Sequence, residues 1–273
     1  MTEEVEYILG TDSEEIHRLR VQHAAWQEHL ASLCARAGLA PGDSVLDLGC
    51  GPGFTSFDLA QLVGPTGKVL ALDISPRFLD FLARERDRLG VVQIDVLEGS
   101  ADDVDLPPAT FAFAYTRWLL CWLEHPERVL AAVADALQPG GVFVVQEYLD
   151  WGSLKLVPRD ADFDRGVEAC LASWPAGGAT IDICDHLPTL AKEAGFDVES
   201  FRPVSRLGPV DSPEWRWVIG FLRSYLPKLV ERGLIDEAGR DAALVVMDER
   251  EAAGAGYILG PTMADLVLRK PRA

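Results

Sequence analysis

A glycine-rich loop carries the clearest chemical signal in the sequence. It spans residues 47–53 and reads Asp-Leu-Gly-Cys-Gly-Pro-Gly. Glycine lets a backbone turn sharply and lie close to a ligand, because no Cβ stands in the way. A dinucleotide fingerprint would place its third glycine at position 54, where this chain has Phe54. The loop is therefore predicted to hold a nucleoside that carries a methionyl zwitterion, rather than a pyrophosphate, with contacts from Asp47, Gly49, Cys50, Gly51 and Gly53.

Two further strand ends support a nucleoside site. Asp73 closes the second strand-like run, where a carboxylate can accept hydrogen bonds from both ribose hydroxyls. Ile74 is predicted to form an apolar wall beside the adenine, and Ser100 and Ala101 are predicted adenine contacts after the third run. A glycine loop alone is also compatible with a simple turn between a strand and a helix. The combination of the loop with Asp73 and the later strand end favours a ligand site.

The elements that must position these residues alternate along the chain. Apolar strand-like runs and helical patterns succeed one another up to residue 148, which is typical of βα units and a mostly parallel sheet. The strand-like runs are 44–48, 68–72, 92–97, 111–115 and 141–148. The helical patterns between them are 54–63, 76–89 and 126–137. The predicted fold class is therefore α/β.

The whole chain is predicted to be one domain. Residues 1–37 form an N-terminal helical cover, and the Rossmann-like core comprises 38–148, 185–204 and 261–270. The remaining segments, 149–184 and 205–260, are predicted to be lid insertions.

The insertions are rich in aromatic residues. Trp217, Phe221 and Tyr225 recur every four residues, so they are predicted to share one face of a helix. Such residues suit a lid over an aromatic or otherwise apolar small molecule. Ordinary packing of helices on the sheet edge explains many of the same aromatics, and both readings stay open.

Composition limits the classes of partner. The chain has 273 residues, of which 48% are hydrophobic and 25% charged, as in ordinary globular proteins. Its net charge of −18 opposes phosphate backbones and anionic lipid, so neither a nucleic-acid nor a membrane partner is expected. No apolar run approaches the roughly 20 residues of a membrane helix. The acidic start lacks the features of a signal peptide, so a cytoplasmic protein is expected.

The cysteines and histidines give no sign of a metal centre. The five cysteines have no CxxC spacing and are predicted to be reduced, packed thiols. No pair of histidines has the spacing of metal ligands together with a third ligand, so no metal site is predicted.

Three motifs together resemble those of a known family. Residues 45–53 resemble motif I of the class I S-adenosylmethionine-dependent methyltransferases, residues 71–75 the acidic motif that follows it, and residues 137–141 the turn before strand five. The branch most similar is the ubiquinone/menaquinone-biosynthesis-like group of small-molecule methyltransferases. That similarity extends to Tyr7–Gly10, Glu15, Arg18, Leu19, Gln22, Leu187, Pro188 and Ala194–Phe196. It implies a Rossmann-like, seven-stranded, mostly parallel sheet with helices on both faces, S-adenosyl-L-methionine as cofactor, S-adenosyl-L-homocysteine as product and no metal.

The chain departs from the family pattern in two places. Ser100 stands where an aspartate usually bonds the adenine amino group, and Ala112 replaces an aspartate at the start of the fourth strand. Neither change removes a charged anchor for the ribose or the methionine. A single lost neutral hydrogen bond is expected to cost about 1 kcal/mol of binding free energy.

The resemblance also implies which residues surround the methionine end of the cofactor. Tyr7 and Gln22 belong to the predicted cover and are expected to touch the donor or the acceptor. Arg117 is expected to bind the methionine carboxylate or a substrate anion, and a structural salt bridge is its alternative role. Trp118 is expected to wall the sulfonium with a cation–π contribution, and its alternative is plain core packing.

Two residues are candidate catalytic groups. Glu147 lies at the end of the fifth strand, where a carboxylate can contact the acceptor or act as a base. Its alternative is a carboxylate satisfied by backbone donors. His186 opens the helix after the first insertion and is a second candidate base. A sulfonium is already an activated donor, so a base is needed only for an acceptor that arrives protonated.

The sequence thus predicts an enzyme that methylates a small aromatic or apolar metabolite by in-line displacement. The alternatives are a methyltransferase acting on RNA or protein, and a cofactor-binding relative with other chemistry, such as a cyclisation. The expected partner is a small-molecule acceptor. Both a monomer and a homodimer stay open.

Overall fold

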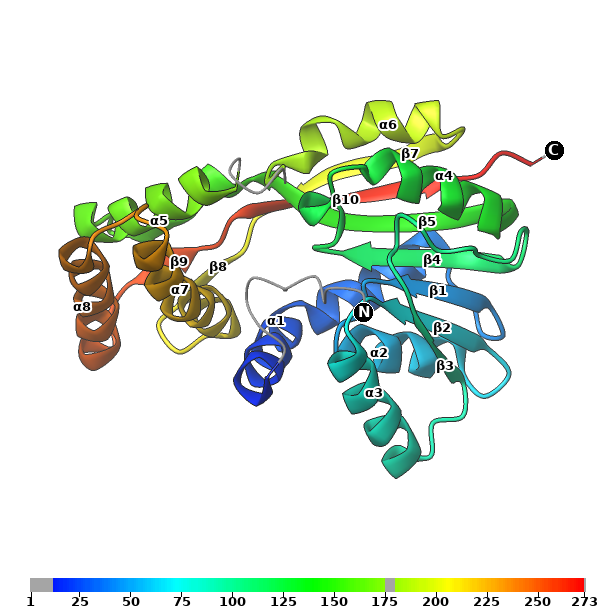
Figure 1. The fold of residues 1–273 in the computed structure, drawn as a ribbon, viewed down its shortest axis with the longest axis horizontal. Coiled ribbons are helices and arrows are strands. Elements are labelled where there is room, and N and C mark those ends of the chain that lie inside the picture. The colour runs from blue at the N-terminus through cyan, green and yellow to red at the C-terminus, as the bar shows by residue number, and fades with distance from the viewer. Residues whose placement is uncertain (1–11, 175–179, 273) are drawn as a thin grey trace.

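Seven strands form the main sheet, in the spatial order β3, β2, β1, β4, β5, β10 and β7 (Figure 1). The computed structural model describes residues 12–174 and 180–272, so Tyr7 lies outside the described residues. β10 runs antiparallel to β5 and β7, and the other pairs are parallel. The predicted mostly parallel sheet is confirmed. Its strands are β1 (Ser44–Leu48), β2 (Lys68–Asp73), β3 (Ile94–Glu98), β4 (Phe111–Arg117), β5 (Leu137–Asp150), β7 (Asp197–Val204) and β10 (Thr262–Arg269).

Helices cover both faces of this sheet. The first three pack on one face, through Leu30, Val63 and Leu82, and two later helices pack on the other, through Val133 and Leu187. Strands covered on both faces must be apolar on both sides, which explains why Val45, Leu46 and Leu48 of β1 are all buried. The helices are α1 (Ser13–Ala37), α2 (Phe54–Val63), α3 (Pro76–Leu89), α4 (Pro126–Ala136) and α6 (Leu187–Glu193), with the short 3-10 helices η1 (Leu120–Trp122), η2 (Trp151–Ser153) and η4 (Ile183–Asp185).

Several element boundaries differ from the sequence prediction. β5 begins at Leu137 rather than at Gly141, because Leu137 already pairs with Phe111 of β4 before a register shift. The helix after the first insertion was expected to open at His186; it begins at Leu187, and Ile183–Asp185 before it form η4. Such boundaries depend on pairing with distant strands, which local sequence patterns do not report.

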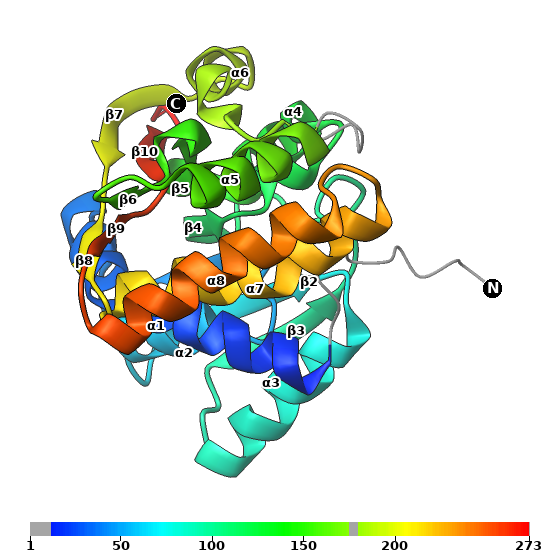
Figure 2. The same ribbon diagram turned by 90° about the vertical axis from the view of Figure 1, so that its left-hand side faces the viewer.

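The two predicted insertions combine into one structural unit. β6 from the first insertion pairs with β9 from the second, which also pairs with β8, so the small three-stranded sheet draws on both. Figure 1 shows α5, α7 and α8 of the two insertions gathered at one end of the molecule, and Figure 2 looks onto that end. On α7, Phe221 and Tyr225 stack with ring centroids 5.2 Å apart, as their spacing predicted. The elements are β6 (Lys155–Val157), β8 (Leu207–Pro209), β9 (Tyr257–Leu259), α5 (Ala161–Ser173), α7 (Pro213–Glu231) and α8 (Glu237–Ala253).

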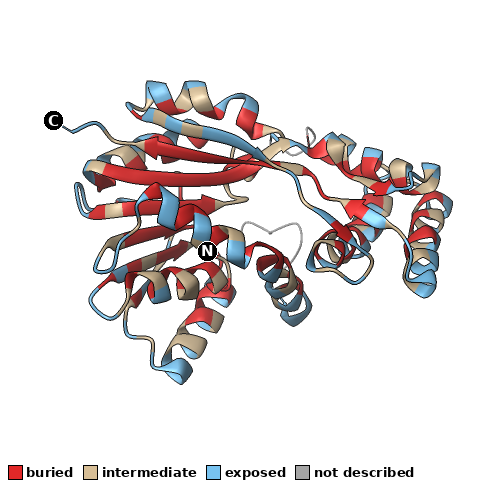
Figure 3. Cartoon of the chain, turned by 180° about the vertical axis from the view of Figure 1, so that it is seen from behind, coloured by how far each residue is buried: buried red, intermediate tan, exposed pale blue. Residues whose placement is uncertain are grey.

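Burial follows this division into a sheet core and an insertion core. The central strands are buried along most of their length, whereas the outer helix surfaces are exposed (Figure 3). A second core lies between α1, α5, α7 and α8 and contains the tryptophans Trp26, Trp151, Trp174, Trp215 and Trp217. Among the described residues, no helix combines the length and the apolar character that a membrane span requires.

Candidate functional site

The glycine loop lies at the carboxyl edge of the sheet, between the end of β1 and the start of α2. Its three glycines have left-handed φ angles of 65° at Gly49, 54° at Gly51 and 84° at Gly53. Side chains rarely adopt this conformation, so glycine is required by the path of the backbone. A Cβ on Gly53 would lie 2.0 Å from the Leu82 side chain of α3, whereas one on Gly51 would meet nothing within 4 Å. Gly53 therefore lets α3 approach, and Gly51 leaves open space at the loop.

Asp73 ends β2 beside this loop and organises it. Its Oδ2 accepts a hydrogen bond from the Gly51 N–H at 2.8 Å, and its Oδ1 accepts one from the Ser75 N–H at 2.9 Å. Burial raises the pKa of the Asp73 carboxyl, and these backbone donors oppose that rise. Each carboxylate oxygen can accept a second bond, so the group retains capacity for ribose hydroxyls.

The predicted adenine contacts follow the ends of β2 and of its neighbour β3. Ile74 is 47% exposed, which is high for an isoleucine and suits an apolar wall awaiting a ligand. Ala101 is buried. The Ser100 hydroxyl donates to the carboxylate of Asp102, a residue that the sequence analysis did not single out. Asp102 thus brings an acidic group to the place where Ser100 had replaced the usual aspartate.

Asp47 and Cys50 are the buried members of the loop. The Ser56 hydroxyl donates to Asp47 Oδ2 at 2.6 Å, and burial raises the pKa of Asp47 to about 7. Burial also raises the pKa of the Cys50 thiol, which keeps it protonated. Both side chains contact protein in the structure, so their predicted cofactor contacts stay predictions.

Arg117 is the last residue of β4, the strand that pairs with β1 before the loop. Its Nη2 donates to His23 Nδ1 at 3.1 Å and lies 3.3 Å from Thr55 Oγ1 at the start of α2. Its Nη1 is buried and has no hydrogen-bond partner among the described residues. A buried donor without an acceptor is costly. No ion pair to Arg117 is present in residues 12–174 and 180–272, and its predicted contact with the methionine carboxylate stays a prediction.

Trp118 follows β4 in a strained conformation. Its φ of 56° is unusual for a large side chain, and such outliers concentrate at functional sites. The Arg117 guanidinium lies over the Trp118 ring, 4.7 Å from its centroid. The same ring contacts Trp26 and Trp217, so core packing, its alternative role, is present in the structure.

Leu119, the residue after Trp118, packs against the glycine loop. A Cβ on Gly49 would lie 3.0 Å from Leu119 Cδ1, so the loop and the segment after β4 are in close contact. This segment is held in turn by Glu147, whose Oε1 accepts from the N–H groups of Leu119 at 2.8 Å and Leu120 at 2.7 Å. Glu147 is fully buried, and burial raises its pKa to about 7. Its Oε2 has no partner among the described residues.

The geometry of Glu147 matches the alternative that the sequence left open, a carboxylate bound by backbone donors. His186, the other candidate base, is exposed at the start of α6. Its backbone carbonyl accepts the N–H groups of Thr189 and Leu190. A catalytic role for either residue stays a prediction.

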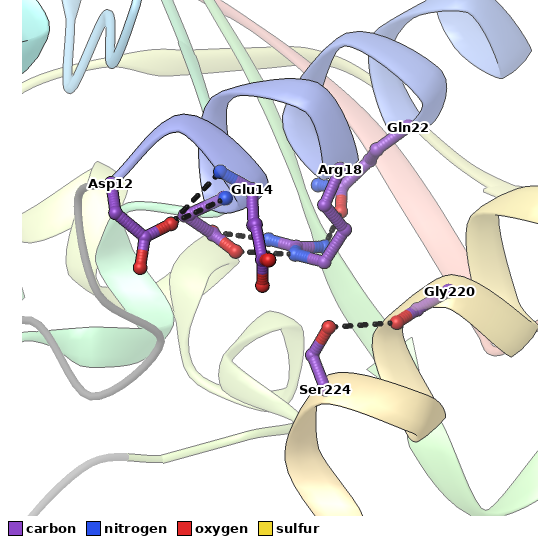
Figure 4. Close-up of polar contacts among 7 residues, drawn as sticks. Asp12, Glu14, Arg18, Gln22, Gly220 and Ser224 are labelled. Carbon is purple, nitrogen blue, oxygen red and sulfur yellow. Dashed lines mark hydrogen bonds and ion pairs between the residues drawn. The ribbon is translucent and has the colours of Figure 1, made fainter.

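Gln22 belongs to a buried polar network on α1. Figure 4 shows the hydrogen bond from the Arg18 guanidinium to the Gln22 side chain. The guanidinium binds both oxygens of Glu15 and the Gln22 amide oxygen, each at 2.7 Å. It also lies 6.0 Å from the centroid of the Phe221 ring on α7. The Gln22 side chain is therefore tied to the face of α1 that meets the insertions.

That face of α1 lies near a small aromatic pocket. The pocket holds about 10 Å³, the space of a single water molecule, in the ligand-free structure. The Trp151 indole N–H is buried there without a partner among the described residues. Its lining residues are Tyr148, Trp151, Leu154, Trp217, Val218, Phe221 and Pro261.

A larger groove of about 720 Å³ lies between the start of α1 and α3. It is lined by Ile16, His17 and Arg20, which lie on the opposite face of α1 from Arg18 and Gln22. The groove is therefore separate from the aromatic pocket, and none of the predicted site residues lines it.

Comparison with known proteins agrees with this arrangement. Residues 45–141, which span the loop, β2, β3, β4 and the start of β5, match a family described as "Methyltransferase domain". A trans-aconitate 2-methyltransferase of Methylobacterium nodulans is 37% identical over 171 residues, 56% of this chain and 64% of that protein. A demethylmenaquinone methyltransferase of Symbiobacterium thermophilum is 32% identical over 124 residues, 45% of this chain and 49% of that protein.

The match of solved structures is broader but shows the fold alone. The [4+2]-cyclase SpnF superimposes with a TM-score of 0.60 at 19% sequence identity, covering 90% of this chain and 82% of that one. Solved structures described as putative methyltransferases match with similar scores. The chain spans roughly two fifths to two thirds of the length of the first curated relatives. Residues 45–141 therefore form a methyltransferase domain, and in this domain and its curated relatives the chain is similar to the class I S-adenosylmethionine-dependent methyltransferases.

Proposed function

We propose that the protein transfers a methyl group from S-adenosylmethionine to a small apolar or aromatic metabolite. The observation that carries the cofactor assignment is the convergence of three groups at one sheet edge. These are the open left-handed Gly51, the Asp73 carboxylate bound to its N–H, and the buried, unpartnered Nη1 of Arg117. A nucleoside with an amino-acid tail needs a close backbone, an acceptor for ribose hydroxyls and a cation.

Each group has a separate task in this proposal. Asp73 accepts the ribose hydroxyls, Ile74 covers the adenine, and Arg117 binds the carboxylate. When bound, S-adenosylmethionine supplies a methyl group that its sulfonium already activates. The remaining work of the protein is to align the acceptor and to exclude water, which supplies much of the rate in such displacements.

We place the acceptor beside the residues that line the aromatic pocket. Because this pocket holds only about 10 Å³ in the structure, its lining must move apart to admit a metabolite. Trp118 connects it to the cofactor edge, because its ring contacts Tyr148 and Trp217, two residues of the pocket lining. An apolar lining with few polar groups selects an apolar or aromatic ligand. The named relatives act on chemically different acceptors, so the substrate class rests on this lining.

No general base is needed in this proposal. Glu147 is bound to the backbone of Leu119 and Leu120, and we assign it the task of holding the segment that faces the loop. The sulfonium is already an activated methyl donor. An acceptor whose nucleophilic atom has a free lone pair can therefore react with it without losing a proton first.

Calorimetric titration with S-adenosylmethionine and S-adenosylhomocysteine tests the cofactor. Wild-type protein is expected to bind both, and Asp73→Ala is expected to weaken binding by at least about tenfold, because two charge-assisted bonds to the ribose are lost. Asp95→Ala, which removes an exposed aspartate of the neighbouring strand β3, serves as a control with unchanged affinity. Absence of binding at high micromolar concentration would overturn the proposal.

Mass spectrometry of metabolite pools incubated with methyl-labelled donor tests the transfer itself. Labelled small molecules are expected. Cofactor binding without transfer to any metabolite contradicts the proposed activity and favours a relative with other chemistry. Label recovered only in RNA or protein contradicts the small-molecule acceptor.

A further inference from the structure

Arg117 is arranged in an unusual way for a buried cation. In a chain with 43 acidic residues, no carboxylate among the described residues pairs with it. Its Nη2 is instead satisfied by two neutral acceptors, the imidazole of His23 and the hydroxyl of Thr55. The positive charge is therefore held in place without being neutralised by a direct ion pair, and Nη1 is left for another group.

The hydrogen bonds of His23 define its tautomer. Its Nδ1 faces the Arg117 guanidinium, which can only donate, so Nδ1 must accept. Its Nε2 lies 2.9 Å from Asp58 Oδ2, so this nitrogen carries the proton and donates to the carboxylate. Asp58 is itself held by Gln27, whose amide donates to Oδ1 at 2.8 Å. A neutral imidazole with a proton on Nε2 satisfies every one of these contacts.

We propose that His23 and Asp58 are positioning residues that keep Arg117 ready for the carboxylate of the cofactor. This inference rests on the proposed function. The imidazole of His23 lies between Asp58 and the guanidinium. The aspartate therefore orients the imidazole without forming an ion pair that would neutralise Arg117. The relay runs from α2 through α1 to β4, and the helix α1 thereby fixes a group on the sheet.

Protonation of His23 would break the relay. An imidazolium has no acceptor at Nδ1 and places a second positive charge against Arg117. Burial and the charge of Arg117 lower the pKa of His23, and Asp58 opposes this. The charged groups that face the ring are Asp58 from α2 and Arg117 from β4, and Phe54 covers it at 5.9 Å between centroids. Affinity for the carboxylate is therefore expected to fall as the pH drops below neutrality.

Two ligands allow the contribution of the carboxylate contact to binding to be measured apart from that of the nucleoside contacts. S-adenosylhomocysteine carries the amino-acid tail, and 5′-methylthioadenosine lacks it. The ratio of their affinities measures what the tail contributes. Wild-type protein at pH 8 is expected to prefer S-adenosylhomocysteine, and Arg117→Gln is expected to abolish most of that preference.

Two substitutions of His23 distinguish its two bonds. The amide of His23→Asn places an acceptor near the position of Nδ1, and that of His23→Gln places a donor near Nε2. His23→Gln is expected to lower the affinity ratio about tenfold while leaving the affinity for 5′-methylthioadenosine unchanged. His23→Asn is expected to retain more of the ratio. His125→Gln, at an exposed histidine before α4, is the matched control with no effect.

The pH profile provides a measurement that does not depend on a stable variant. In wild-type protein the affinity ratio is expected to fall between pH 7 and pH 5, and the part of this fall that His23→Asn removes belongs to His23. A ratio that is unchanged in His23→Gln, together with the same pH profile in wild type and His23→Asn, would overturn the inference. Failure of both ligands to bind wild-type protein would instead overturn the proposed function.

Discussion

Several ionisable side chains of this protein are buried, and each has a pKa moved by that burial. Asp47 and Glu147 have pKa values raised to about 7, and His23 has a lowered pKa. In all three cases loss of solvation is the largest cause. Asp47 and Glu147 are held by a hydroxyl donor and by backbone donors respectively, which orient the carboxylate without an ion pair.

The substitution Glu147→Gln tests whether burial of an ionised carboxylate destabilises the fold. The folded-state pKa of Glu147 lies above its ordinary value of 4.5, so the carboxyl stabilises the fold below pH 4.5 and progressively loses that contribution up to about pH 7. A glutamine does not ionise and still offers an oxygen to Leu119 and Leu120. The free energy of unfolding of Glu147→Gln is therefore expected to rise relative to wild type between pH 5 and pH 8, by up to about 3 kcal/mol.

Urea denaturation at both pH values measures this difference. Glu168→Gln, at an exposed position of α5, is the control and is expected to follow wild type. Parallel stability profiles for Glu147→Gln and wild type would show that burial does not destabilise the ionised carboxylate.

At the scale of elements, the glycine loop connects a strand to a helix and also allows a third element to approach. Gly49 faces Leu119, Gly53 faces Leu82 of α3, and Gly51 faces open space. The same spacing that predicted a ligand loop thus contains one glycine required by packing and one that leaves room for a ligand.

Alanine substitutions separate these two requirements. Gly51→Ala is expected to cost about 1 kcal/mol of unfolding free energy, from the left-handed φ alone. Gly53→Ala is expected to cost about 2–4 kcal/mol, because its Cβ also overlaps the Leu82 side chain. Thermal and urea unfolding of the two variants measure the difference, and equal losses would mean that α3 shifts freely.

The element α1 serves the site through separate faces. His23 contacts Asp58 of α2, Trp26 enters the aromatic cluster, and Arg18 is tied to Glu15 and Gln22. The helix α1, which the sequence predicted as part of the N-terminal cover, therefore packs against α2 and the aromatic cluster.

At the scale of the whole molecule, aromatic side chains join three parts of the chain. The rings of Trp26 on α1, Trp118 after β4 and Trp217 on α7 lie between 5.3 and 5.8 Å apart in each pair. Aromatic groups bury large areas, so such a contact connects the insertions to the core strongly.

Trp217→Ala is expected to lower the free energy of unfolding by about 3–5 kcal/mol, because a fully packed ring is lost at this junction. Trp217→Phe is expected to lose less. Denaturation monitored by circular dichroism measures both. A loss below about 1 kcal/mol for the alanine variant would mean that the insertions fold without support from α1 and β4.

The sequence predicted the α/β class, the alternation of strands and helices along the chain and the glycine-rich loop after the first strand. These features depend on residue spacing within short segments. Periodicity of apolar residues reports which faces are buried, and glycine spacing reports backbone geometry. Asp73 was found in the same way, as the acidic residue that ends a strand.

Only the tertiary structure decided the environments of the remaining site residues. His23 and Arg117 are 94 positions apart, and Glu147 meets Leu119 from a different strand, so no local pattern reports these contacts. The joining of the two insertions through β6 and β9 has the same origin. Spacing along the chain constrains which groups are available, whereas pairing of distant strands decides which acceptor each buried donor meets and which donor, Nη1 of Arg117, is left without one.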